Sequence, residues 1–429
     1  MTDNNYRMIQ NDRRPFVSRL ASGYKGVAIL LLNTLVLYAC LNLFLGLVIQ
    51  IRHASRASGA DVSDPVTSKW GADVLDQVYP DIDRDRRGQM LLECWNRPFV
   101  YGDFTHFKER PWNGKYVNVT DDGYRKSVDQ GPWPPSSENL NVFVFGGSTT
   151  FGYGQPDELT LPSFLQQALA AHTKRKVSVY NFGVGWYFST QERICFEKLL
   201  MQGHVPQIAF FIDGINDSSQ MNNRPAFSRE MAGAFDTVVG FDLSQSPATA
   251  SATYLQRLVE VGFVRLPIGR LVEYLKSHLP VFNRLQELAG GGQVNEAESE
   301  SLRQACETYF MNKLLIEQAC QALGVLPVFV WQPAPGYKYE LKHDLFAGQN
   351  KFERQGEFYR TMLEQLEQRP PDPRFIWCAD MQENAAECLY CDHLHYTSAF
   401  MKTIADRIIR ICSERKLLGE YLPSKSELN

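Results

Sequence analysis

The chain has 429 residues, of which 44% are hydrophobic, so it can bury at least one full core and has room for one large domain with additions. It carries 44 lysines and arginines against 48 acidic residues, which gives a net charge of −4. With this balance and without a long basic run, we expect no nucleic-acid partner.

An uncharged segment near the N-terminus, residues 26–51, exceeds the roughly 20 residues that a helix needs to cross a bilayer. More basic residues precede this segment than follow it, and basic residues stay on the cytoplasmic side. We therefore predict a single-pass membrane protein with residues 1–25 in the cytoplasm and the remainder outside it, in the periplasm if the cell is Gram-negative. The alternatives are a cleaved signal peptide, for which the apolar run is too long, and a buried core helix, which does not need such uniform apolarity.

Residues 52–67 are polar and are predicted to form a stalk. Residues 68–140, called here the N-terminal extension, are rich in aromatic residues, proline and glycine, and the run GKYVNVTDDGYR predicts a small strand-and-turn element. We expect the extension to pack on the domain that follows, residues 141–417, and residues 418–429 to form a tail.

Strands and helices alternate from Asn141 onward. The apolar runs VFVF, VSVYNFG, IAFFIDG, VLPVFVW and RFIWCAD predict strands. Between or after them, the stretches LPSFLQQALAAH, TQERICFEKLLMQG and SAFMKTIADRIIRICSERKLLG predict amphipathic helices. Such alternation is typical of an α/β fold, and we predict a doubly wound, parallel five-stranded sheet.

A long insertion, residues 218–300, separates the third predicted strand from the fourth, and it is too long for an ordinary connection. Part of it is apolar on a helical period, so we predict a helical insertion that packs on the core or caps the site. The alternative is a basic amphipathic helix on the membrane surface, although two prolines interrupt its face.

Three predicted strands end in segments that can bind a ligand. The stretch FVFGGSTTFGYG places the hydroxyl of Ser148 at the carboxyl edge of the sheet, where ligands bind in such folds, shortly before a helix expected to begin near Leu159. The stretch FIDGINDSS brings Asn216 to the same edge, and the loop NFGVGWYFST can direct a backbone amide there. Each stretch alone is also compatible with an ordinary turn.

The last candidate segment is CLYCDHLHYTSAF, in which Asp392 and His395 are three residues apart. In a helical turn their side chains meet, so the carboxylate can fix the tautomer of the imidazole that a serine nucleophile needs. His393 is the second candidate, but it faces away from Asp392 in such a turn. A rival interpretation is a zinc site. Its ligands would be Cys388, Cys391, His393 and His395, although such sites favour a wider separation between the cysteine pair and the histidine pair.

Nine cysteines are present, one of them in the apolar segment. The remaining eight are an even number in a domain predicted to be exported, which permits disulfides without fixing their connectivity. We expect a disulfide that involves Cys378, Cys388 or Cys391 and tightens the loop before His395, whereas Cys195 and Cys320 lie in helical patterns that suit buried thiols.

Taken together, the motifs FGGSTTFG, NFGVG, GIND and DHLH, in this order across about residues 140–415, resemble the SGNH, or GDSL-like, hydrolase superfamily. The resemblance implies that Ser148 is the nucleophile and that Asp392 and His395 are its catalytic partners. It also implies that Asn216 donates to the oxyanion. No cofactor and no metal are implied.

Two positions depart from the family pattern. The aspartate that usually precedes the nucleophile is Gly147 here, a variation that we expect to have no direct catalytic cost. In the second motif, the glycine expected after Gly185 is Trp186. The oxyanion hole is therefore expected to use the amide of Ser148 together with that of Gly185 or Trp186.

The resemblance implies acyl transfer through an acyl-serine intermediate. We predict a serine esterase that acts on acyl esters, with O-acyl groups of an envelope or extracellular glycan as the expected substrate and the membrane as a partner through residues 26–51. An O-acyltransferase would use the same residues and differ only in the acceptor. A lipid esterase and a non-catalytic glycan-binding protein are the further alternatives.

Overall fold

The computed structural model describes residues 13–57, 64–219, 222–228, 231–232, 266–269, 271, 296–346, 353–419 and 421. Most of the predicted insertion and most of the predicted tail lie outside these residues. The chain divides into two compact units, which are considered separately: residues 1–62 with 233–293, and residues 63–232 with 294–429.

The first unit contains one long helix, α1 (Arg13–Ala57). Its segment Tyr24–Val48 is long and apolar enough to cross a membrane, and it is not buried within the protein. A signal sequence near an N-terminus has the same features, so the helix is a candidate span, and anchoring and orientation stay predictions.

The second unit is built on a parallel sheet, which confirms the predicted fold class. Its strands are β5 (Leu140–Gly146), β6 (Val177–Asn181), β7 (Ile208–Asp213), β8 (Leu326–Trp331) and β9 (Phe375–Trp377). They lie in the order β6-β5-β7-β8-β9, and every neighbouring pair is parallel. The chain order reverses beside β5, and such a switch point is where open α/β sheets bind ligands.

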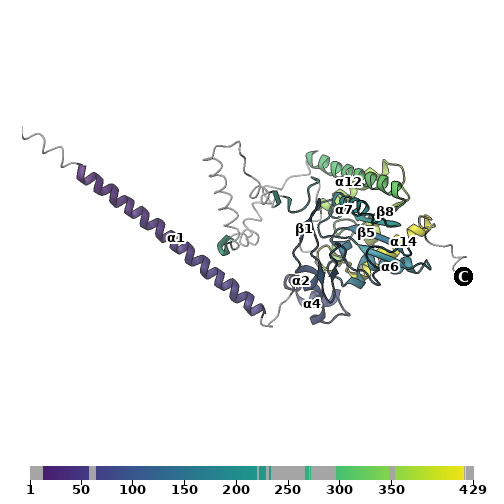
Figure 1. Ribbon diagram of the computed structural model, residues 1–429, viewed down its shortest axis with the longest axis horizontal. Helices are drawn as coiled ribbons and strands as arrows, with labels where there is room; N and C mark the ends of the chain where they lie inside the picture. Colours follow the sequence, from purple (N-terminus) through teal and green to yellow (C-terminus); the bar gives the residue numbers. More distant parts are fainter. Residues whose placement is uncertain are drawn as a thin grey trace, which may run out of the picture. The chain divides into compact units, whose positions relative to one another are not determined.

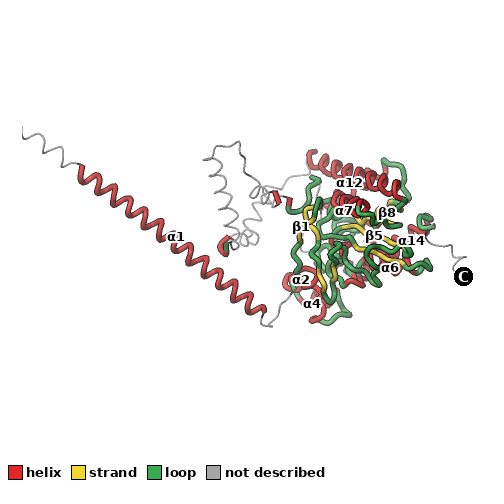
Figure 2. Tube along the Cα trace, viewed as in Figure 1, coloured by secondary structure: helices red, strands yellow, loops and turns green. Residues whose placement is uncertain are grey.

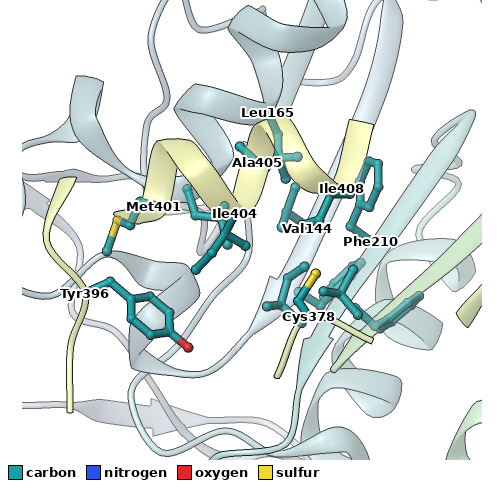
Figure 3. Close-up of a cluster of buried hydrophobic side chains, with 14 of the residues drawn as sticks. Val144, Leu165, Phe210, Cys378, Tyr396, Met401, Ile404, Ala405 and Ile408 are labelled. Atoms are coloured by element: carbon teal, nitrogen blue, oxygen red, sulfur yellow. The ribbon is translucent and has the colours of Figure 1, made fainter. Parts of the chain in front are cut away.

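Helices cover both faces of the sheet (Figure 1). One face carries α6 (Leu161–Ala170) and α14 (Ser398–Glu414), and the other carries α7 (Ser189–Met201), α12 (Glu296–Leu323) and α13 (Glu353–Glu367). Figure 3 shows Ile404, Ala405 and Ile408 of α14 packing toward Val144 and Phe210 of the strands. The central strands are buried along their whole length because both of their faces are covered, as their continuous apolar sequences predict.

The N-terminal extension, together with the last residues of the predicted stalk, consists of short elements joined by loops and turns (Figure 2). They are α2 (Pro65–Trp70), α3 (Ala72–Val78), α4 (Arg84–Trp95), β1 (Val100–Gly102), β2 (His106–Lys108), β3 (Trp112–Asn113) and β4 (Asn118–Val119). After β4 the chain turns back, and the amide of Arg125 donates to the carbonyl of Asn181 in β6 at 2.9 Å. This bond joins the extension to the edge of the sheet.

Candidate active site

The candidate nucleophile lies two residues after the end of strand β5. Ser148 is the first residue of the one-turn helix α5 (Ser148–Phe151), so its backbone N–H has no acceptor within that helix. The longer helix expected near Leu159 begins at Leu161 instead, after a 3₁₀ turn over Asp157–Leu159. Ser148 is half-buried at the carboxyl edge of the sheet, as its sequence position predicts.

Ser148, His395 and Asp392 form one continuous chain of hydrogen bonds. The Nε2 atom of His395 lies 2.8 Å from Oγ of Ser148, and its Nδ1 atom lies 2.8 Å from Oδ2 of Asp392. The serine and the histidine are 247 positions apart in the sequence, so only the fold brings them together. This is the geometry in which an imidazole can take a proton from the hydroxyl while the carboxylate orients the ring.

The Asp392 and His395 side chains meet in a tight bend, not in the predicted helical turn. Oδ1 of Asp392 accepts the backbone amides of Leu394 and His395, both at 2.8 Å, and the amide of Cys391 donates to the carbonyl of His395 at 2.7 Å. Burial acts to raise the pKa of Asp392, but the adjacent His395 outweighs it and lowers this pKa to about 2. The carboxyl group therefore stays ionised at neutral pH.

Two aromatic side chains hold the imidazole of His395 from the sides. The ring of Tyr153 stacks on it with centroids 5.5 Å apart, and the ring of Trp95 meets it edge-on at 5.0 Å. Trp95 belongs to α4 of the extension, so the extension contributes directly to the surroundings of the candidate general base.

Asn216 reaches the same edge from the loop after β7. Its side-chain amide donates one hydrogen bond to the carbonyl of Tyr187 at 2.6 Å, which leaves its second N–H for a ligand. The loop turns sharply at Gly214, whose φ of 119° suits glycine alone, and Asp217 accepts the amide of Gly214. A Cβ atom on Gly147 would lie 2.4 Å from Nδ2 of Asn216, so the missing side chain at position 147 makes room for Asn216.

Of the two backbone amides that the sequence offered as oxyanion donors in the loop after β6, one is bonded within the protein. The amide of Gly185 donates to Oε1 of Glu109 at 3.0 Å, so it is already bonded and the structure does not support it as an oxyanion donor. The amide of Trp186 has no acceptor among the described residues. Trp186 has a φ of 68°, a left-handed conformation that bulky residues rarely adopt and that the expected glycine would adopt freely.

A cavity of about 220 Å³ opens over Ser148. Its walls are mainly aromatic, and its lining residues are Trp95, Phe99, Ser148, Tyr153, Gly185, Trp186, Asn216, His393, Leu394 and His395. The cavity thus collects the predicted site residues that have to face a substrate. His393, the second candidate base, also lines the cavity, with its side chain 41% exposed, whereas His395 is the histidine bonded to Oγ of Ser148.

Several residues of the site were not predicted. Trp95 and Phe99 line the cavity and Glu109 holds the loop after β6, and all three belong to the extension. The aromatic composition of this segment was its only signal, and it did not identify individual residues.

The expected disulfide is not present, because all nine cysteines are free thiols. The thiol of Cys391 lies 3.9 Å from the carbonyl oxygen of Tyr153, and that of Cys388 lies 3.3 Å from the carbonyl oxygen of Tyr390. The zinc interpretation also conflicts with the geometry, since both ring nitrogens of His395 are bonded to Ser148 and Asp392 and neither is left for a metal.

No protein-family model and no curated protein matches this sequence. Among solved structures, the chain is similar to a lipase/acylhydrolase from Enterococcus faecalis, at 13% identity and a TM-score of 0.33 over 64% of this chain and 96% of that one. It is also similar to the acetyl xylan esterase AlAXEase, at 12% identity and a TM-score of 0.32, over 63% of this chain and 98% of that one. A third similar structure is Axe2, an acetylxylan esterase from Geobacillus stearothermophilus, at 12% identity and a TM-score of 0.29, over 64% of this chain and 94% of that one. At these identities and scores, the similarity carries no conclusion about the activity of this chain.

Proposed function

We propose that this protein is a serine esterase that removes short O-acyl groups through an acyl-serine intermediate. The observation that carries the proposal is the 2.8 Å contact between Nε2 of His395 and Oγ of Ser148, with Asp392 bonded to the opposite ring nitrogen. A hydroxyl that lines a cavity and is bonded to an oriented imidazole is the arrangement that activates a weak nucleophile.

In the proposed reaction, His395 accepts the proton of Ser148 while the serine oxygen attacks the ester carbonyl. Asp392 stabilises the imidazolium that forms. The amides of Ser148 and Trp186 and the side chain of Asn216 hold the negative oxygen of the tetrahedral intermediate. His395 then protonates the leaving alcohol, and a water molecule, activated by the same imidazole, releases the acid and restores the serine.

The size and lining of the cavity favour a short acyl group. A volume of about 220 Å³ is below the roughly 300–1,000 Å³ of typical small-molecule sites, and part of it must admit the reacting ester group itself. Its aromatic walls suit a small apolar group such as acetyl. A long lipid chain would have to leave the cavity, so we rank a lipid esterase below an esterase for short acyl groups.

We further propose that the acyl group is carried by an envelope or extracellular glycan and that residues 26–51 anchor the enzyme in the membrane with its catalytic part outside the cytoplasm. Trp186 supports a glycan because its half-exposed ring at the cavity offers a flat apolar surface on which a sugar ring can stack. An O-acyltransferase would use the same residues with a sugar hydroxyl in place of water.

The proposal can be tested with the full chain in detergent, by release of p-nitrophenol from p-nitrophenyl acetate and octanoate. We expect hydrolysis of the acetate ester, no hydrolysis by Ser148→Ala, and a loss of roughly 10²- to 10³-fold in kcat for Asn216→Ala. Hydrolysis that persists in Ser148→Ala, or that favours octanoate, would contradict the proposal. Adding an oligosaccharide acceptor and measuring acylated sugar distinguishes transfer from hydrolysis.

A further inference from the structure

Glu109, the residue that follows β2 in the extension, connects three segments at a buried position. It is 2% exposed and accepts hydrogen bonds from three groups. Its Oε1 atom accepts the amide of Gly185 at 3.0 Å and the hydroxyl of Tyr153 at 3.0 Å, and its Oε2 atom accepts Nη1 of Arg97 at 3.2 Å. A buried carboxylate is costly unless it is paired and hydrogen-bonded, and this one meets both conditions.

The two groups on Oε1 belong to segments that support different parts of the candidate site. Gly185 immediately precedes Trp186, whose amide is the proposed backbone donor of the loop after β6. Tyr153 follows the nucleophile by five residues, and its ring stacks on the imidazole of His395. One carboxylate oxygen therefore fixes both the loop that carries an oxyanion donor and the ring that supports the general base.

Arg97 holds this carboxylate from a fixed place in the extension. Its Nε atom donates to the carbonyl of Glu93 at 2.6 Å, its Nη2 atom donates to that of Cys94 at 3.3 Å, and its guanidinium lies 4.9 Å from the ring centroid of Phe151. Arg97 is itself 5% exposed. Both members of the pair are thus bonded in several directions, which leaves them little freedom to move.

Burial and the contacts of Glu109 act on its pKa in opposite directions. Burial is the largest influence and raises the pKa of Glu109 above its ordinary value, whereas the charge of Arg97, the amide of Gly185 and the hydroxyl of Tyr153 favour the ionised form and act to lower it. A protonated carboxyl group would turn one of its oxygens into a donor that faces other donors.

We propose that Glu109 is a positioning residue for acyl transfer, which holds the loop of Trp186 and the ring of Tyr153 in the geometry that the transition state requires. The inference rests on the proposed esterase function. Its physical basis is preorganisation, because donors that are already aimed at the developing oxyanion need no reorganisation during the reaction. A displacement of about 1 Å by a change outside the reacting groups can cost about 100-fold in rate.

The main test is Glu109→Gln in the full chain, which keeps the shape of the side chain and removes its charge. We expect kcat for p-nitrophenyl acetate to fall roughly 10- to 100-fold with KM little changed. The rate at which a fluorophosphonate labels Ser148 should fall by a similar factor, since that reaction also builds negative charge on an oxygen in the oxyanion hole. Thermal unfolding of the variant shows whether it is folded at the assay temperature.

A matched control is Asp372→Asn, which removes the charge of a partly buried carboxylate that pairs with Lys313 at 2.5 Å. Asp372 precedes β9 and therefore lies toward the amino edge of the sheet, opposite to Ser148. This variant should lose stability but retain kcat within about twofold, because it touches none of the groups that act in the transition state.

Tyr153→Phe gives a second, milder test, because it removes only the hydroxyl bonded to Glu109 and keeps the ring on His395. We expect a smaller loss in kcat than in Glu109→Gln, and this variant decides the question if Glu109→Gln does not fold. Provided that the native chain is active, an unchanged kcat in the folded Glu109→Gln variant overturns the inference. If Glu109→Gln is unfolded, an unchanged kcat in Tyr153→Phe overturns it. A native chain that neither hydrolyses the ester nor reacts with the fluorophosphonate overturns the proposed function instead.

Discussion

Trp186 combines an unfavourable backbone with a half-exposed side chain, so two substitutions can separate the two effects. Its φ is 68° and the residue is 50% exposed at the cavity. Strain of this kind is usually retained where it serves function. We predict that the indole ring contacts the substrate and that the backbone conformation is retained to present the amide, and we compare Trp186→Gly with Trp186→Ala.

The expected stabilities follow from the exposure and the backbone angle. Full burial of a large apolar side chain contributes about 1.5–3 kcal/mol, so a half-buried indole contributes about 1–1.5 kcal/mol, and both variants lose it. Alanine keeps the unfavourable left-handed backbone, whereas glycine relieves about 1–2 kcal/mol of it and loses part of that gain through greater freedom in the unfolded chain. Trp186→Ala should therefore be about 1 kcal/mol less stable than Trp186→Gly, which should lie close to the native protein.

Activity distinguishes the role of the ring from that of the backbone. Both variants keep the amide, so both should hydrolyse p-nitrophenyl acetate with kcat within about threefold of the native value. For an acetylated oligosaccharide, both should lose about tenfold in kcat/KM, as expected for one lost aromatic contact of about 1.4 kcal/mol. Steady-state kinetics and chemical denaturation of the three proteins provide the measurements. Equal stability of the glycine and alanine variants, or unchanged kcat/KM for the sugar ester in both, would refute the reasoning.

Three further predictions concern single groups. Asp392→Asn should leave the chain folded and lower kcat by about 10⁴-fold, because the imidazole loses the charge that orients and stabilises it; ester hydrolysis at pH 7 measures this. Gly147→Ala should lower kcat by roughly 100-fold with little effect on KM, since the new Cβ has to displace the side chain of Asn216, and a variant as active as the native protein would show that the loop has room. Burial, together with neighbouring carboxyl groups, raises the pKa of Glu192 and Asp213, so the folded chain keeps protons that the unfolded chain releases above about pH 4. The free energy of unfolding should therefore fall as the pH rises above that value. The Asp213→Asn variant cannot ionise at this position, so its free energy of unfolding should increase relative to that of the native protein between pH 4 and pH 7. A difference that does not grow with pH would contradict this.

The sheet could be predicted because its strands are marked by local patterns. Each of the five strands begins within about two residues of the start of a predicted apolar run. A parallel strand that is buried on both faces needs such a continuous apolar sequence. Ser148 and Asn216 lie two and three residues beyond the ends of β5 and β7, so parallel topology alone brings them to one edge. Asp392 and His395 were paired by their spacing, and the pairing is present although the predicted helical turn is a bend.

Contacts between distant segments could not be predicted in the same way. Glu109 lies in the stretch HFKERPW, where it reads as one of several surface charges, and its partners Tyr153 and Gly185 are 44 and 76 positions away. No periodicity links such residues. The substitution at Trp186 did carry a signal, since a tryptophan at a position expected to be glycine predicts an unusual backbone, but which amide of the loop stays free depends on Glu109.

The N-terminal extension is therefore expected to be part of the catalytically active domain. Residues 141–417 contain every group that reacts in the proposed mechanism, yet without residues 68–140 the imidazole of His395 would lose the edge-on contact of Trp95. The loop after the nucleophile would also lose Arg125, whose buried guanidinium donates to the carbonyls of Phe151 and Gly152 at 3.0 and 2.9 Å. Because catalysis depends on donors and bases that are held in place before the substrate arrives, removal of the extension should abolish activity even where the sheet itself still folds.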